Sequence, residues 1–290
     1  MMSNAHSLAR LPVLVGVALL SIHCTDSVGP DRQVHPLAAT TAAGGGIQLD
    51  QWNAAMGSQT NPLMIIKGFN PTNPHAGDAI IATFFWFGAP GGVAGNIIDS
   101  VTDVLTTSPY TPVGNKYNLV EFISNGTVSM ATYVATDVQN FPDAGVDPSR
   151  ILAVKADLKV PVADGGVLLS AWIGVDGIST QALGQHHSLS GSGTPYPLNG
   201  PTTADPGEIS VNPGALAYGV SMSSPAAGVT GPAGWTNIAT PSDLFMSGDG
   251  EFDAQFTVSS TGGSAHPTWS WFFTAPGSWL ATALSLNAGP

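Results

Sequence analysis

Short apolar segments at even spacing are the feature that most constrains the fold of this chain. Gly, Pro, Asn and Asp separate these segments, which is the pattern of an all-β domain. The clearest segment, 151–160, places Leu152 and Val154 on one face and Lys155 and Asp157 on the other. Because successive side chains of a strand point to opposite faces, this alternation predicts a half-buried strand.

A second segment, 252–258, alternates in the same way, with Phe252 and Phe256 on one face and Asp253 and Gln255 on the other. We expect the face of Phe252 to be buried and the face of Asp253 to be solvated. Continuously apolar segments are typical of strands that are covered on both faces. The other expected strands, most of them continuously apolar, are 79–87, 97–105, 128–136, 166–175, 216–222, 268–274 and 280–286.

Together these segments predict one all-β domain over 47–290, with the fold of a jelly-roll-like antiparallel β-sandwich. The Pro/Gly-rich segment 184–213 is interpreted as a long surface loop, because a domain boundary there would leave too few strands in each half. Helical spacing occurs only around 49–56 and is weak there. The buried face of the sandwich is expected to contain Leu152, Val154, Leu158, Phe252 and Phe256.

The N-terminal segment has the layout of a secretory signal, because Arg10 precedes an apolar run at 11–22. This run is too short for a permanent membrane span, which needs about 20 residues. We therefore expect residues 1–23 to be a signal peptide or anchor. Residues 24–46 end in a Thr/Ala/Gly tract and are expected to form a flexible tether.

Cys24 follows the apolar run directly and resembles the lipidated cysteine of bacterial lipoproteins. Ser21 and His23 differ from the Leu and small residue usual at those positions, so ordinary cleaved secretion and an uncleaved N-terminal anchor remain as alternatives. Cys24 is the only cysteine, which excludes an intrachain disulfide and a multi-thiolate metal site. We expect an exported protein at the outer membrane, the periplasmic face, the cell surface or outside the cell.

The charge balance excludes one class of partner. The 290 residues include 7 Lys or Arg and 19 Asp or Glu, which gives a formal net charge of -12. Nucleic-acid binding needs a basic surface, so this chain is not expected to bind nucleic acid. The expected partners are other envelope or surface components, or glycans, with membrane contact through the N-terminal segment only.

Five segments resemble, in order, those of a family of bacterial and phage extracellular β-sandwich domains. They are 98–114 (IDSVTDVLTTSPYTPVG), 128–136, 167–175, 234–236 (GWT) and 279–286. The resemblance covers about residues 75–290 and implies a jelly-roll-like fold on a secreted or surface protein. It implies no biochemical activity, since its motifs are structural. At 103–109 (DVLTTSP) the chain departs from the short Asp-Ser-x-Gly-Asn turn that is usual in the family.

Three carboxylates at alternate positions, Asp249, Glu251 and Asp253, would share one face of a strand. Such a row suits oxygen coordination of calcium, or the paired carboxylates of a glycosidase cleft. The interpretation that we favour is an acidic turn that leads into the solvated face of a strand, with calcium binding and catalysis as alternatives. No cofactor is assigned, and calcium at this row is the one alternative that stays open.

Two aromatic pairs, Trp269 with Trp271 and Phe84 with Trp86, each project from one face of a strand. If exposed, such a pair would offer a platform for stacking on sugar rings. Burial in the core is the commoner outcome and is the interpretation that we favour; the platform is the alternative.

Four histidines carry a weaker signal for a transition metal. His186 and His187 lie in a Gly/Ser-rich segment, and His75 and His266 each stand beside a proline. Adjacent residues of an extended chain point to opposite sides, so His186 and His187 cannot easily hold one ion. All four are interpreted as solvent-exposed loop histidines, and no metal site is assigned.

The sequence contains no G-x-S-x-G, P-loop, H-E-x-x-H or C-x-x-C motif. We therefore expect a non-catalytic module, secreted or tethered to the envelope, for adhesion, binding or assembly at the cell surface. The alternative is a carbohydrate-active protein, lectin-like or a glycosidase, that uses Glu251 and exposed tryptophans.

Overall fold

The computed structural model describes residues 46–290 except 59–60, 89–94, 148, 197–198, 226–227, 241 and 244–249. The predicted signal or anchor segment, the tether up to residue 45 with Cys24, and Asp249 lie outside the described residues. The described part is nearly all β, with twenty strands and the four-residue helix α1 (Ser179–Ala182). It contains no helix that is long and apolar enough to cross a membrane.

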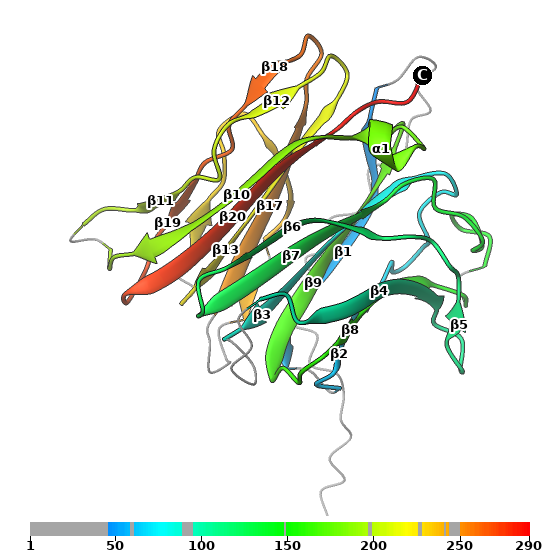
Figure 1. Ribbon diagram of the computed structural model, residues 1–290, viewed down its shortest axis with the longest axis horizontal. Coiled ribbons are helices and arrows are strands. Elements are labelled where there is room, and N and C mark those ends of the chain that lie inside the picture. Colours follow the sequence, from blue (N-terminus) through cyan, green and yellow to red (C-terminus); the bar gives the residue numbers. More distant parts are fainter. Residues whose placement is uncertain are drawn as a thin grey trace, which may run out of the picture. The chain divides into compact units, whose positions relative to one another are not determined.

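Three antiparallel sheets form the body of this part (Figure 1). The central sheet has the strand order β1 (Gln48–Ser58), β9 (Asp164–Ile173), β3 (Ala79–Phe87), β7 (Val128–Ala135) and β6 (Asn118–Ser124). The six-stranded sheet contains β10 (Leu183–Gly193), β20 (Gly277–Leu286), β13 (Leu216–Ser224), β17 (Gly250–Val258) and β15 (Thr236–Ala239), with β16 (Ser242–Asp243) also paired to β17. The four-stranded sheet contains β2 (Met64–Gly68), β8 (Leu152–Leu158), β4 (Ile98–Leu105) and β5 (Thr111–Pro112).

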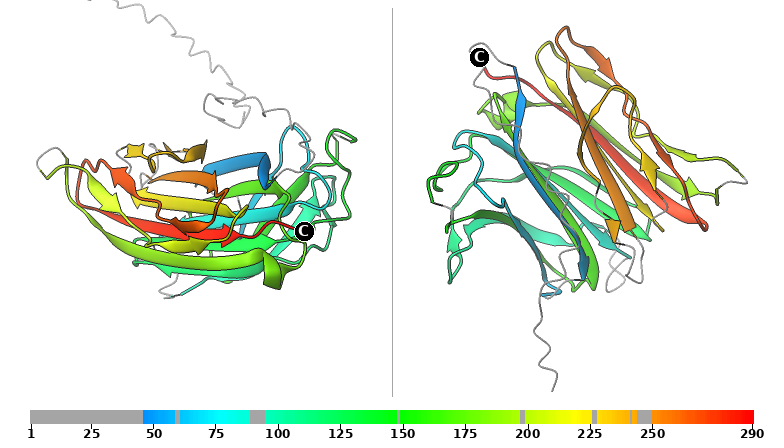
Figure 2. Two further views of the ribbon diagram at one scale, coloured as in Figure 1. Left: turned by 90° about the horizontal axis from the view of Figure 1, so that it is seen from above. Right: turned by 180° about the vertical axis from the view of Figure 1, so that it is seen from behind.

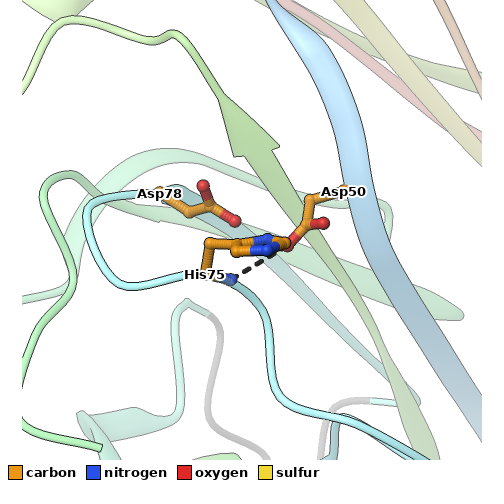
Figure 3. A group of neighbouring side chains, drawn as sticks. All are labelled: Asp50, His75 and Asp78. Carbon is orange, nitrogen blue, oxygen red and sulfur yellow. Dashed lines mark hydrogen bonds and ion pairs between the residues drawn. The ribbon is translucent and has the colours of Figure 1, made fainter. Parts of the chain in front are cut away.

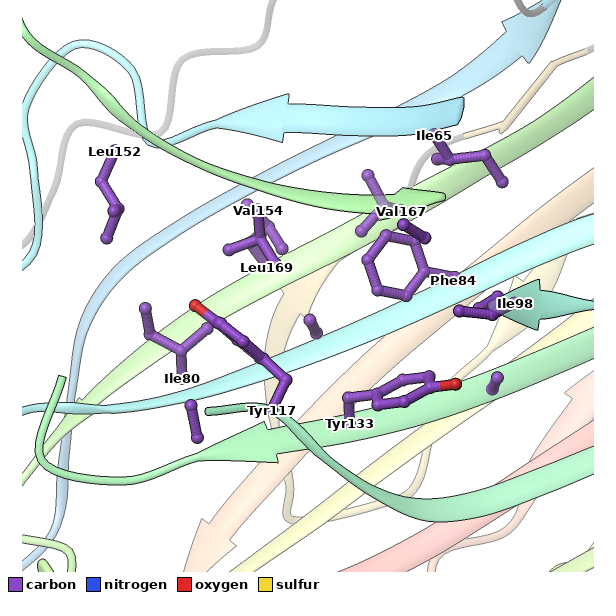
Figure 4. Close-up of a cluster of buried hydrophobic side chains, with 14 of the residues drawn as sticks. Ile65, Ile80, Phe84, Ile98, Tyr117, Tyr133, Leu152, Val154, Val167 and Leu169 are labelled. Atoms are coloured by element: carbon purple, nitrogen blue, oxygen red, sulfur yellow. The ribbon is translucent and has the colours of Figure 1, made fainter. Parts of the chain in front are cut away.

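Strand β3 shows how these sheets are stacked. Its side chains alternate between two cores: Ile80 and Phe84 pack toward the four-stranded sheet, and Ile81 and Phe85 toward the six-stranded sheet. The central sheet therefore lies between the other two (Figure 2), and Figure 4 shows side chains of the core that it shares with the four-stranded sheet. Coverage on both faces explains why the sequence of β3 is continuously apolar.

Two small sheets cover the other face of the six-stranded sheet, opposite the central sheet. Trp269 and Trp271 pack there against Ala281 of β20, and Val211 packs against Ala217 of β13. The fold is therefore a stack of sheets in which the six-stranded sheet, like the central one, is covered on both faces. The small sheets consist of β11 (Thr202–Ala204), β19 (Trp269–Trp271) and β14 (Val229–Thr230), and of β12 (Ile209–Val211) and β18 (Gly263–Ala265).

The prediction of a β-sandwich is confirmed in its coarse form, because antiparallel sheets pack face to face. The expected core positions are buried, except for Phe256, which is half-buried. The weak helical spacing at 49–56 is misleading, because this segment lies within strand β1. Long-range pairing with β9 decides its conformation, and local spacing does not.

The interpretation of 184–213 as a surface loop is wrong. This segment contains most of β10 and all of β11 and β12. The glycine content of this segment is like that of a loop, but its glycines serve packing. A Cβ on Gly191 would clash with the Trp279 ring on the neighbouring strand β20. Small residues in this segment therefore make room for an aromatic side chain and do not mark a turn.

Candidate functional site

The predicted carboxylate row begins outside the described residues with Asp249 and continues into strand β17. Asp253 on this strand is 2% exposed. Its Oδ1 accepts hydrogen bonds from Trp269 Nε1 and Gln255 Nε2, both at 2.8 Å. Its Oδ2 accepts from Asn237 Nδ2 at 2.9 Å and from Thr240 Oγ1 at 2.7 Å. With four donors on its two oxygens, this carboxyl group joins β17 to β15 and β19.

The expectation that Asp253 lies on a solvated face is therefore wrong. Its face of β17 is covered by the three-stranded sheet, and Gln255 on the same face is also buried. Calcium binding by Asp253 would require breaking hydrogen bonds that already satisfy its oxygens. The alternation of β17 instead reflects a buried polar network.

The favoured interpretation that Trp269 and Trp271 are buried is confirmed, and the alternative of an exposed platform is wrong. Both side chains are fully buried in the core between β19 and the six-stranded sheet. The indole N–H of Trp271 donates to Ser221 Oγ at 2.9 Å, and Ser221 donates to the carbonyl of Leu280 at 2.9 Å. The structure thus brings Trp269 and Asp253 together, but in a core where neither can meet a sugar.

Glu251 occupies a different position in the carboxylate row. It is 9% exposed, and its Oε2 accepts a hydrogen bond from the backbone N–H of Gly228 at 3.0 Å. Burial raises the pKa of Glu251; the Gly228 hydrogen bond opposes this shift and the charge of Asp253 adds to it. The Oγ of Ser223, its register partner on β13, is buried and has no hydrogen-bond partner among the described residues.

The side chains of the four histidines are at least partly exposed, but His186 and His187 lie on a strand and not in a loop. His186 and His187 belong to β10, where the Nδ1 of His186 lies 2.5 Å from Glu121 Oε1 and His187 contacts the Pro206 carbonyl. His266 Nε2 lies 2.7 Å from Asp205 Oδ1. None of these three belongs to a group of three metal-ligating residues in the described part of the chain.

The fourth histidine, His75, belongs to a group that the sequence did not reveal. The ligating atoms of Asp50, His75 and Asp78 all lie within 4.8 Å of one another, and Figure 3 shows the three side chains converging. Asp50 is 8% and Asp78 3% exposed, whereas the His75 side chain is 45% exposed. The Oδ2 of Asp50 accepts a hydrogen bond from the backbone N–H of His75 at 2.9 Å and lies 3.0 Å from its Nδ1.

Two local irregularities position these side chains. Asp50 is an extra residue in β1, because Leu49 and Gln51 pair with consecutive residues of β9, and such a β-bulge redirects its side chain. His75 and Asp78 are the ends of a turn, in which the Asp78 N–H lies 3.3 Å from the His75 carbonyl. Gly77 supplies the positive φ of 97° that this turn requires.

The loop that carries His75 is held firmly by hydrogen bonds. The buried amide of Asn73 donates to the carbonyls of Pro142 and Arg150 at 2.8 and 2.9 Å, and its oxygen accepts from Leu152 N at 2.7 Å. The Oδ1 of Asp143 accepts from the backbone N–H of Ala76 at 3.0 Å. The group of Asp50, His75 and Asp78 is therefore a preorganised arrangement.

The electrostatics of this group are unusual for a structural cluster. Burial raises the pKa of Asp78 to about 9, helped by a hydrogen bond and charge repulsion from Asp50 and opposed by a backbone hydrogen bond of His75. A hydrogen bond between two carboxyl groups needs a shared proton. Without that proton, Asp78 Oδ2 has no donor among the described residues.

The turn spacing of His75 and Asp78 is visible in the sequence as His-Ala-Gly-Asp. Asp50 is not visible as their partner, because it lies 25 residues away and a bulge sets its direction. Sequence reasoning could therefore have found two of the three residues.

In comparisons with known proteins, no family model matches this chain and no curated protein matches it.

Proposed function

We propose that this protein is an exported, non-catalytic β-sandwich module that binds or assembles with other components of a bacterial envelope. In this proposal residues 1–23 direct export, Cys24 carries the lipid, and residues 24–46 tether the folded part. The proposal also includes a jelly-roll strand order for the β-sandwich, which the family resemblance implies.

The observation that carries the proposal is the edge of the six-stranded sheet at β10. This eleven-residue strand pairs with β20 on one side, and no other described strand pairs with it. The free N–H and C=O groups of an edge strand are a template onto which an extended peptide adds as a further strand.

Edge strands are usually protected by Lys, Pro or a bulge. The first part of β10 is partly covered, because Gln185 Oε1 accepts the backbone N–H of Ser210 at 2.6 Å. Residues 188–193 (SLSGSG) contain no proline and no charged side chain, and Leu189 is 44% exposed there. This uncharged segment is the part of the edge that is best suited to strand addition by an extended segment of an envelope protein.

A carbohydrate-active protein is the second candidate, and one observation favours it. The pKa of Glu251 is raised by burial, as a general acid requires. A glycosidase also needs a second carboxylate about 5 to 10 Å away, and Asp253 is committed to its four hydrogen bonds. For this reason we rank the candidate second.

The test is a binding and turnover assay of the purified full chain with envelope fractions and a panel of polysaccharides. Saturable binding without product, weakened about tenfold by Leu189→Lys, supports the proposal, because a lysine on an edge opposes strand addition. Leu63→Lys is the matched control, since Leu63 is 47% exposed and lies outside a strand. Turnover that Glu251→Gln abolishes, with folding intact, would overturn the proposal in favour of the second candidate.

The tether is tested separately by metabolic labelling with a fatty acid. Each buried acyl methylene contributes about 0.8 kcal/mol to membrane binding, so a multiply acylated Cys24 would hold the protein on membranes. We expect label in the wild-type chain and none in Cys24→Ser. Equal labelling and equal fractionation of the two proteins would show that Cys24 is not the anchor.

A further inference from the structure

We propose that Asp50, His75 and Asp78 form a binding site for a divalent first-row transition-metal ion of the zinc type. The proposal rests on the convergence of the three ligating atoms within 4.8 Å and on a buried oxygen without a partner. It does not depend on the proposed surface function.

The first argument is the unpartnered oxygen. Asp78 is 3% exposed, and its Oδ2 has no hydrogen-bond partner among the described residues. Buried carboxyl oxygens are nearly always paired, because leaving one unpaired carries the full cost of removing it from water. Figure 3 shows this carboxyl group directed toward His75 and Asp50. A bound cation would lie between these three side chains.

The second argument is the close approach of buried acidic groups. Asp50 and Asp78 are two buried carboxyl groups side by side, and in the described part of the chain neither forms an ion pair with Lys or Arg. Asp143 adds a third acid near the same turn, since its charge interacts with both Asp78 and His75. A divalent cation would bridge the two carboxyl groups and satisfy the Asp78 oxygen at once.

The donor set determines the class of ion. Zinc accepts both imidazole nitrogen and carboxylate oxygen as ligands, whereas calcium and magnesium prefer oxygen ligands alone. Zinc bonds of about 2.0 to 2.2 Å require the three groups to move slightly closer together. The His75 side chain is 45% exposed, so it can turn toward the ion, and water can fill the remaining coordination position.

The site would also fasten the bulge in β1 to the turn at 75–78. An ion that binds the folded state alone stabilises it in proportion to the logarithm of the ion concentration. We therefore expect the melting temperature to rise with added Zn²⁺, and to rise less with Ca²⁺ or Mg²⁺ at the same concentration.

The experiment measures Zn²⁺ binding by calorimetry on the full chain after treatment with a chelator. We expect one saturable site that His75→Ala and Asp78→Asn each weaken by at least about tenfold, because each removes a ligand. Asp78→Asn keeps the shape of the side chain and removes a buried acid, so this variant is expected to fold. Circular dichroism and the melting temperature without metal confirm that it does.

His266→Ala is the matched control, because His266 is also exposed and beside a carboxylate, Asp205. All variants keep the same N-terminal residues, so any zinc held by Cys24 or nearby histidines contributes equally to each. Zinc binding that His75→Ala and Asp78→Asn leave unchanged, or that His266→Ala weakens equally, would overturn the site. Equal or tighter binding of Ca²⁺ would overturn the assignment of the ion.

Discussion

Strands β8 and β17 alternate large apolar and polar side chains in the same way, yet only β8 presents its polar face to water. On β8 the outward Asp157 is 42% exposed and pairs with Lys155 at 2.7 Å. On β17 the corresponding polar residues, Asp253 and Gln255, are 2% and 6% exposed. The inward faces are alike, because Leu152 of β8 and Phe252 of β17 are both fully buried.

The position of each strand in the stack causes this difference. β8 belongs to the four-stranded sheet, and its polar side chains point away from the core that this sheet shares with the central sheet. β17 belongs to the six-stranded sheet, whose other face is covered by β19 and its tryptophans. Alternation of apolar and polar side chains along a strand therefore indicates only that its two faces differ in chemistry. Whether a further sheet covers the polar face determines if that face contacts water or a hydrogen-bond network.

The largest expected effect separates the two polar faces directly. Asp253→Ala removes the acceptor for four donors, two of which, on Trp269 and Gln255, lie in buried side chains. We expect the free energy of unfolding to fall by about 3 to 5 kcal/mol, as for the loss of one partner from a buried polar network. Chemical denaturation monitored by tryptophan fluorescence measures this change.

The matched variant on β8 is Asp157→Ala. Its pair with Lys155 is partly exposed, and exposed pairs contribute about 0 to 1 kcal/mol. We expect a loss below about 0.5 kcal/mol, in the range of ordinary surface substitutions. Similar losses for Asp253→Ala and Asp157→Ala would show that the two polar faces do not differ.

The second prediction concerns the inward faces, which should respond alike. Leu152 is fully buried in the core shown in Figure 4, between the four-stranded and central sheets. Leu152→Ala should lower the free energy of unfolding by about 2 to 5 kcal/mol, because it leaves a cavity in a packed core. A loss below about 0.5 kcal/mol in the same denaturation assay would contradict the inward assignment of this face of β8.

The comparison also shows which parts of the fold were predictable. Apolar content located β3 and β7 correctly, since a strand with two apolar faces needs no information about its neighbours. The burial of Asp253 could not be predicted, because it depends on Trp269 reaching it from a strand 16 residues away. Edge strand β10 was missed because Ser and Gly indicate a turn by composition, although here they fit against aromatic side chains.

The same reasoning applies to the candidate sites. The sequence placed Glu251 and Asp253 on one face correctly, because that follows from the period of a strand. It could not predict that Asp253 is satisfied by neighbours while Asp78 has an oxygen without a donor. Hydrogen-bond satisfaction is a property of tertiary contacts, so the group of Asp50, His75 and Asp78 emerges only from the fold.

The smallest expected effect tests whether the polar face of β17 is as dry at Glu251 as it is at Asp253. Burial raises the pKa of Glu251 above its ordinary value of 4.5, so in that pH range the folded chain holds a proton that the unfolded chain has lost. The free energy of unfolding must then fall as the pH rises from about 4.5 through the folded pKa. Below this window both states are protonated, so the penalty is absent, and above it the full penalty remains.

Glu251→Gln cannot ionise and should escape this penalty while keeping the shape of the side chain. Denaturation of both proteins at pH 4 and pH 8 gives the comparison, and the other acids, which titrate in both proteins, cancel in the difference. We expect the stability of Glu251→Gln relative to the wild type to be higher at pH 8 than at pH 4. A difference that stays constant with pH would mean that Glu251 is hydrated like Asp157, so that the dry part of this face would end between Glu251 and Asp253.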